Sequence, residues 1–209
     1  MKDAFKEYLL SEFKACIGGE WKTCGKDVQY RIDRVGPNQA YLSFQGTCSK
    51  VDLGVDLKVF CNPFKEKLKD KYGNVLHHGF QEGFESAFEI IHQELITMGI
   101  QYVDIRGYSL GAAYATLFAL YLPKVNIETE AIVFGCPRIF WLPSKELKIE
   151  AKKRILRIEN YDDIICHLPP CILGFKHIGH VYKIGMAEGF YDFNNHLAQR
   201  YITELKGGY

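Results

Sequence analysis

The stretch Gly107-Tyr108-Ser109-Leu110-Gly111 constrains the fold more than any other part of this chain. Residues 102–106 read as a short buried strand, and residues 109–121, with no Pro and one Gly, read as an apolar helix. A serine between two glycines at a strand-to-helix turn is the pattern of a nucleophile elbow, whose flanking positions must lack side chains so that strand and helix can approach closely. The helix N-terminus beneath the serine favours developing negative charge. The alternative is a tight turn with an incidental serine.

Hydrophobic periodicity assigns the other elements. A spacing of three and four predicts helices over residues 3–16 and 79–98, and a further helix is expected over 192–205. Apolar or alternating runs predict strands from residue 27 and over 40–44, 129–134, 154–158 and 181–184, the first two forming a hairpin around Gly36-Pro37-Asn38. Residues 51–59 fit a strand and a helix equally well.

The alternation of strand and helix after residue 75 predicts an α/β fold, a mostly parallel central sheet with helices on both faces. At 209 residues we expect a single domain spanning 1–209. Ligands of such sheets bind beyond the carboxyl ends of the strands. Three polar features follow strand ends in this chain: Ser109, Asp163 and the turn at Thr47.

Charge and composition exclude several classes of partner. A net charge of +1 gives no reason to expect nucleic acid or an anionic membrane, and no apolar run is long enough to span a bilayer. The first residues lack the apolar core of a signal peptide, and seven cysteines fit free thiols of a reducing compartment. We therefore expect a cytoplasmic protein, although Cys16 and Cys24 could form a local disulfide.

Serine chemistry needs a base beside the hydroxyl and a group that orients the base. At a nucleophile elbow these follow in the order serine, acid, histidine. That order leaves three acids and four histidines: Asp162, Asp163 and Asp192, with His167, His177, His180 and His196. We favour Asp163, because it directly follows a strand, and His196, because it lies in a polar loop at the start of the last helix.

Several motifs together resemble the class 3 lipases, the group of the fungal triacylglycerol lipases, over residues 40–205. They occur in the order of the family: Phe44-Gln45-Gly46-Thr47, Asp52-Leu53-x-x-Asp56-Leu57, His77-x-Gly79-Phe80, Gly107-Tyr108-Ser109-Leu110-Gly111, Phe134-Gly135-Cys136-Pro137-Arg138 and Asn160-x-x-Asp163-Ile164-Ile165-x-His167-Leu168-Pro169-Pro170.

This resemblance implies an α/β-hydrolase fold and a lipase or carboxylic ester hydrolase that acts on acylglycerols or phospholipids without a metal or other cofactor. It makes Ser109 the nucleophile, Asp163 the acid and His196 the base. It places the oxyanion hole at the backbone N–H groups of Thr47 and Leu110. The substrate is then a lipid ester, met at a lipid–water interface, while oligomeric state stays open.

The sequence departs from the family pattern at several positions. The usual His of the elbow is Tyr108, the usual Arg before Gly46 is Gln45, and the usual Trp of the D-x-x-x-D pattern is Leu53. After Cys136-Pro137-Arg138 the family's Val-Gly-Asn is Ile139-Phe140-Trp141. None of these changes removes a group of the expected triad.

Other interpretations remain beside this one. The same triad serves thioesterases and amidases, and a hydrolase fold can persist as an inactive binding module. A Cys/His cluster could indicate zinc, but its spacing fits no closed zinc site: Cys166, His167, Cys171, His177 and His180. Residues 48–64 occupy the place where the resemblance puts a lid, and because this segment is short we expect weak or absent interfacial activation.

Overall fold

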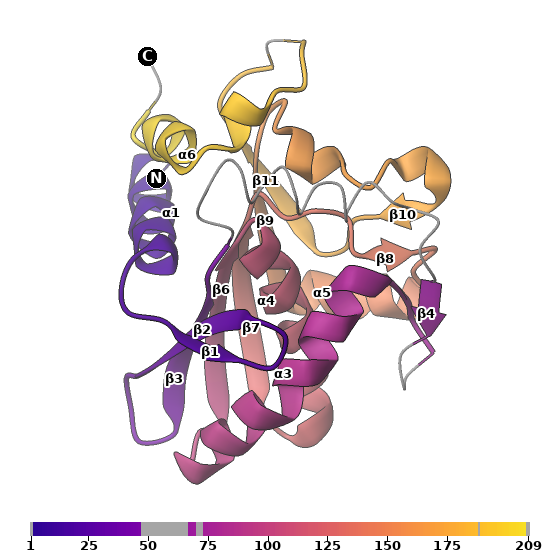
Figure 1. The fold of residues 1–209 in the computed structure, drawn as a ribbon. Helices are drawn as coiled ribbons and strands as arrows, with labels where there is room; N and C mark the ends of the chain where they lie inside the picture. The colour runs from indigo at the N-terminus through magenta and orange to yellow at the C-terminus, as the bar shows by residue number, and fades with distance from the viewer. Residues whose placement is uncertain (1, 47–66, 70–72, 188, 208–209) are drawn as a thin grey trace.

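A seven-stranded sheet forms the centre of the computed structural model, which describes residues 2–46, 67–69, 73–187 and 189–207. Its strands, in spatial order, are β1 (Lys22–Cys24), β2 (Val28–Arg34), β3 (Gln39–Phe44), β6 (Tyr102–Tyr108), β7 (Glu128–Phe134), β9 (Ile155–Asn160) and β11 (His180–Ile184) (Figure 1). Strand β2 is antiparallel to both of its neighbours, β1 and β3, and all neighbouring strands from β3 to β11 are parallel. The predicted hairpin and the mostly parallel sheet are confirmed.

Helices cover both faces of this sheet. On one face lie α1 (Lys2–Ile17) and α6 (Ala198–Leu205), side by side (Figure 1). On the other lie α3 (His78–Thr97), α4 (Leu110–Tyr121) and α5 (Lys145–Arg154). The helices predicted over 3–16, 79–98 and 109–121 are therefore confirmed, and α5 was missed.

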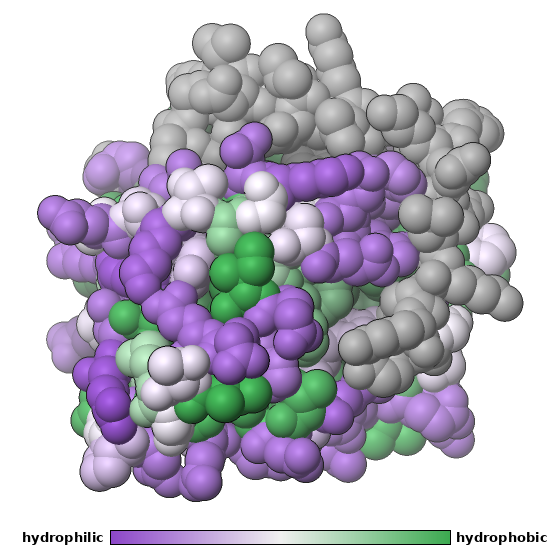
Figure 2. Space-filling view, turned by 60° about the horizontal axis from the view of Figure 1, so that its bottom comes forward, coloured by the Kyte–Doolittle hydropathy of each residue, from purple (hydrophilic) through white to green (hydrophobic). Residues whose placement is uncertain are grey.

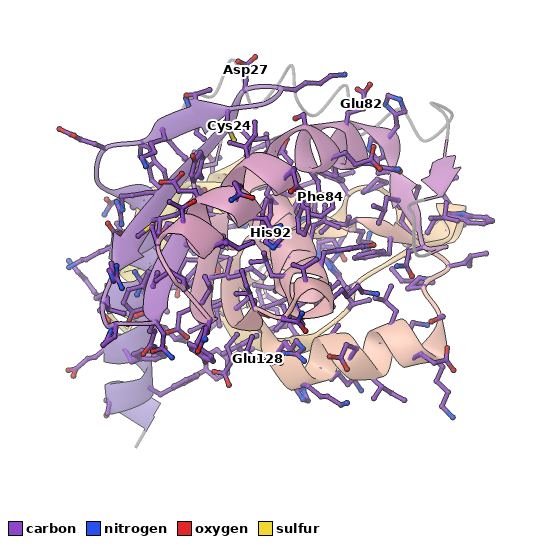
Figure 3. The ribbon with its side chains drawn as sticks, turned by 90° about the horizontal axis from the view of Figure 1, so that it is seen from below. Cys24, Asp27, Glu82, Phe84, His92 and Glu128 are labelled. Atoms are coloured by element: carbon purple, nitrogen blue, oxygen red, sulfur yellow. The ribbon has the colours of Figure 1, made fainter. Side chains whose placement is uncertain are left out.

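The alternation of side chains along β6 separates two apolar cores. Val103 and Ile105 point into the core beneath α3 and α4, whereas Tyr108 belongs to the core beneath α1 and α6. Figure 3 shows Phe84 of α3 directed into the interior and Glu82 at the rim, as expected for an amphipathic helix. The sheet is thus buried on both sides around the carboxyl end of β6.

The C-terminal helix is shorter than predicted. Residues 192–205 form a 3-10 turn, η4 (Phe193–His196), followed by α6. Leu197 separates them with an extended backbone, φ −61° and ψ 139°. Asp192 caps the turn, its Oδ1 accepting from the Asn194 N–H at 3.1 Å. Two short elements with a bend between them replace one continuous helix.

A second, four-stranded antiparallel sheet was not predicted. It consists of β10 (Phe175–Lys176), β8 (Phe140–Trp141), β5 (Val75–His77) and β4 (Lys67–Lys69). Strands of two or three residues are too short to show a period of two.

Figure 2 shows one face of the molecule, on which most of the coloured side chains are hydrophilic. The hydrophobic side chains on this face lie in separate places, as is normal for protein surfaces. Cys16 and Cys24 are free thiols, so the local disulfide is not formed. Among the described residues no helix is long and apolar enough to cross a membrane. The ambiguous stretch 51–59 and the expected lid, 48–64, lie outside the described residues.

Candidate active site

Ser109 lies at the sharp turn between β6 and α4. Its backbone, with φ 58° and ψ −124°, is outside the regions that residues with a side chain normally adopt. Its N–H donates to the Phe134 carbonyl at 3.0 Å. A Cβ on Gly107 would come within 2.2 Å of the Gly111 oxygen, and one on Gly111 within 2.3 Å of the Phe44 oxygen. The glycines therefore permit the close approach that the elbow pattern requires.

His196, the last residue of η4, lies beside Ser109. Its Nε2 lies 2.8 Å from Ser109 Oγ, and its side chain is fully buried. The ring fits against Gly135, whose φ is +58° and where a Cβ would lie 2.8 Å from His196 Cε1. The loop after β7 is thus shaped to admit the imidazole.

Asp163 lies on the other side of the imidazole, just beyond β9. The Nδ1 of His196 is 2.8 and 3.0 Å from the two carboxylate oxygens of Asp163, and Oδ1 also accepts from the Ile165 N–H at 2.9 Å. With Nδ1 donating to the carboxylate, Nε2 is left to accept the serine proton. The structure therefore brings together the serine, histidine and acid favoured from the sequence.

The carboxylate has two further contacts that sequence reasoning missed. The hydroxyl of Tyr201 in α6 donates to Asp163 Oδ2 at 2.7 Å and accepts from the Asn160 N–H at 3.2 Å. Cys166 Sγ lies 3.5 Å from the same oxygen. Burial first, and then the negative charge of Asp163, raise the pKa of Tyr201 and of Cys166 well above their usual values, so both remain protonated donors.

The alternative acids have other contacts. Asp162 Oδ2 accepts from the Gly189 N–H at 2.9 Å, and Asp192 caps η4. Among the alternative bases, His167 packs on the ring of Tyr191 and His177 Nε2 lies 2.6 Å from the Cys166 carbonyl. His180 is exposed on β11.

Of the two residues expected to form the oxyanion hole, Leu110 lies among the described residues. Leu110 opens α4 directly after Ser109, and the first N–H groups of a helix have no acceptor within the helix. Thr47 lies outside the described residues. Its neighbour Gly46 passes so close to the elbow that a Cβ there would lie 2.3 Å from the Tyr108 oxygen and 3.1 Å from Ser109 Cβ. The chain just after β3 therefore passes directly beside Ser109.

A surface groove of about 400 Å³ lies apart from Ser109, on the face of the sheet that carries α1. It is lined in part by Asp104, Glu130 and Leu156. These residues belong to the amino-terminal halves of their strands, away from the carboxyl ends where Ser109 and Asp163 follow. Within the described ranges no three His, Cys, Asp or Glu side chains are grouped to hold a metal ion.

Known proteins match this chain in sequence and in structure. Residues 41–173 match the family model described as lipase (class 3). The structure resembles that of the Rhizomucor miehei triacylglyceride lipase, at 20% identity and a TM-score of 0.68 over 90% of this chain and 81% of that one. A fungal lipase–inhibitor complex, a model for interfacial activation in lipases, matches with the same four values. At this identity the likeness shows the fold, which is the predicted α/β-hydrolase fold.

A curated relative from Fusarium solani, a secreted mono- and diacylglycerol lipase, is 30% identical over 78 residues. The matched stretch is 37% of this chain and 23% of that relative's length. Because this relative is a secreted protein, the expectation of a cytoplasmic location was wrong. An N-terminus without an apolar core and an odd number of cysteines were not sufficient evidence for a compartment. The family match covers more than half of the sequence, and the chain belongs to the class 3 lipase family.

Proposed function

We propose that this chain is a serine hydrolase that cleaves carboxylic esters of lipids, acylglycerols or phospholipids, through an acyl-enzyme. The observation that carries the proposal is the buried chain of contacts from Ser109 Oγ to His196 Nε2, 2.8 Å, and from His196 Nδ1 to Asp163 Oδ2, 2.8 Å. Membership of the class 3 lipase family supports the choice of a lipid ester as the substrate. We further propose that residues 1–209 form one domain and act at a lipid–water interface outside the cell.

In the proposed mechanism Ser109 Oγ attacks the ester carbonyl carbon while its proton passes to His196 Nε2. Asp163 holds the imidazole tautomer and stabilises the imidazolium that forms. The N–H groups of Leu110 and Thr47 stabilise the oxyanion. The bond to the alcohol oxygen breaks and that oxygen takes the proton from His196, leaving the acyl group on Ser109. Water then attacks the acyl carbon while His196 Nε2 takes its proton. The bond between the acyl carbon and Ser109 Oγ breaks, Oγ takes the proton back from His196, and the carboxylic acid leaves.

Hydrolysis of a short p-nitrophenyl ester by the wild type and by Ser109→Ala tests the reaction. We expect the substitution to remove nearly all turnover, because the covalent step needs the hydroxyl. Unchanged turnover in Ser109→Ala would refute the proposal. A comparison of triglyceride, phospholipid, thioester and amide substrates then tests the substrate class. A preference for the thioester or the amide would replace the lipid ester by the other chemistry that the same three side chains support.

A further inference from the structure

The side chain of Tyr108 covers the base from one side. Tyr108 is the last residue of β6, immediately before Ser109. Its ring stacks on the imidazole of His196, with centroids 5.0 Å apart and an interplanar angle of 19°. Its hydroxyl donates a hydrogen bond to the main-chain oxygen of the same histidine. One side chain next to the nucleophile therefore contacts both the ring and the backbone of His196.

The ring of Tyr108 is itself held in place by the core beneath α1. Phe13 of α1 meets it edge-on, with centroids 5.3 Å apart, and Tyr201 of α6 lies 5.8 Å away at 67°. Burial first, and then the negative charge of Asp163, raise the pKa of Tyr108, so the hydroxyl stays protonated and continues to donate. The stacked geometry is therefore fixed by both helices on this face of the sheet.

The charge on His196 gives this contact a chemical meaning. In the proposed mechanism the imidazole becomes an imidazolium while the tetrahedral intermediate forms, in a position that is 0% exposed to water. An aromatic face within about 6 Å attracts a cation, and a neutral imidazole gains much less from it. An interaction that strengthens only when the base is protonated lowers the barrier without tightening substrate binding.

We propose that Tyr108 is a positioning residue whose stacked ring stabilises the protonated form of His196 and whose hydroxyl holds the backbone of that residue. This inference rests on the proposed function.

Three substitutions separate the ring from the hydroxyl. Tyr108→Phe keeps the ring and removes the hydrogen bond, and Tyr108→Leu removes both. A fluorinated phenylalanine at position 108 keeps the size of the ring but withdraws electrons from its face, so it tests the stacking even if the leucine variant does not fold. Tyr182→Leu is the control for lost packing, because Tyr182 contacts Phe5 of α1 in the same core.

The readouts are kcat, KM and the pH dependence of kcat/KM on a soluble p-nitrophenyl ester. The kcat is expressed per active site, and the active sites are counted by titration with a fluorophosphonate. For Tyr108→Leu we expect kcat to fall about 3- to 30-fold with KM unchanged. The acidic half-point of the profile should move down by about 0.5–1.5 pH units, because the imidazolium is less stable without the ring. The fluorinated variant should move in the same direction, whereas Tyr108→Phe and Tyr182→Leu should keep the wild-type half-point.

Titration of the His196 ring by NMR gives the same half-points without any turnover. It therefore tests the stacking even if the wild-type chain proves inactive, an outcome that would count against the proposed function alone. The inference is overturned if the fluorinated and leucine variants keep the wild-type half-point. It is also overturned if Tyr108→Phe shifts the half-point as far as Tyr108→Leu, since the hydroxyl would then account for the whole effect.

Discussion

Ser109 adopts a strained backbone conformation that its surroundings hold in place. Such a conformation costs about 1–3 kcal/mol and persists only where the neighbouring structure fixes it. Here the hydrogen bond to Phe134 and the close passage of Gly46 and Gly111 fix it. The strain directs Oγ toward His196, so it is part of what orients the proposed nucleophile.

The neighbouring acids Asp162 and Asp163 illustrate how a backbone direction decides a role. Asp162 has a φ of +60° and its carboxylate accepts from the Gly189 N–H, whereas Asp163 contacts His196. The sequence favoured Asp163 from its place after a strand, and the contacts agree with that choice. The positive φ of Asp162, which turns its side chain away, could not be predicted from two identical residue types.

Asp163→Asn should lower kcat on a soluble ester by about 10³–10⁴-fold, because an amide no longer selects the imidazole tautomer that accepts the serine proton. The folded fraction, followed by circular dichroism, should remain high enough for the rate to be measured.

Asp162→Asn is the matched control and should change kcat by less than about 3-fold, since asparagine tolerates a positive φ. A larger loss in Asp162→Asn than in Asp163→Asn would exchange the roles of the two acids.

At the scale of elements, the length of each helix or strand decided whether the sequence could predict it. The long helices α1, α3 and α4 and the parallel strands have enough residues to show their period, and their positions were predicted to within about two residues. Helix α5 was missed because only Leu147 and Ala151 are buried among its ten residues, so its apolar stripe is too sparse. Its cap, where Ser144 Oγ accepts from the Leu147 N–H at 3.1 Å, was the available signal.

The junction of β6 and α4 should be intolerant of side chains. Gly107→Ala should lower the free energy of unfolding by at least about 1–3 kcal/mol, because the new Cβ would lie 2.2 Å from the Gly111 oxygen, a main-chain atom. Urea unfolding followed by fluorescence measures the change.

Gly36→Ala is the control. Gly36 lies in the turn of the β2–β3 hairpin, and a Cβ there would meet only Gln39 Cβ, at 3.6 Å. We expect its effect to stay within about 0.5 kcal/mol. Equal stability of the two variants would mean that the elbow is not closely packed.

At the scale of the whole molecule, the candidate site combines segments from distant parts of the sequence. The order serine, acid, histidine was sufficient to reduce the number of candidate acids and histidines. The three favoured side chains each follow a strand or a loop at the same end of the sheet. The supporting contacts of Tyr108 and Tyr201 were not predictable in the same way. They depend on how α1 and α6 pack over the end of β6, and periodicity describes single elements rather than their packing.

The stability of the molecule should fall as the solution becomes acidic. Burial first, and then the positive charge of Arg157, lower the pKa of His177 well below 6.5. Below pH 6.5 the unfolded chain therefore binds a proton at this position that the folded protein does not, and the free energy of unfolding decreases. Urea unfolding of the wild type at pH 7.5 and 5.0 should show a loss that is smaller in His177→Gln.

His180→Gln is the matched control on β11, because His180 is exposed. We expect it to keep the wild-type pH dependence. The assignment to His177 fails if both substitutions leave the loss on acidification unchanged.

The most direct test of the account is covalent labelling of the folded wild-type chain with a fluorophosphonate, followed by peptide mapping by mass spectrometry. An activated serine hydroxyl attacks the phosphorus and releases fluoride, so we predict one adduct per chain, on Ser109, and a much slower reaction in His196→Ala. An unlabelled folded chain, or an adduct on another residue, would contradict the assignment of Ser109 as the nucleophile.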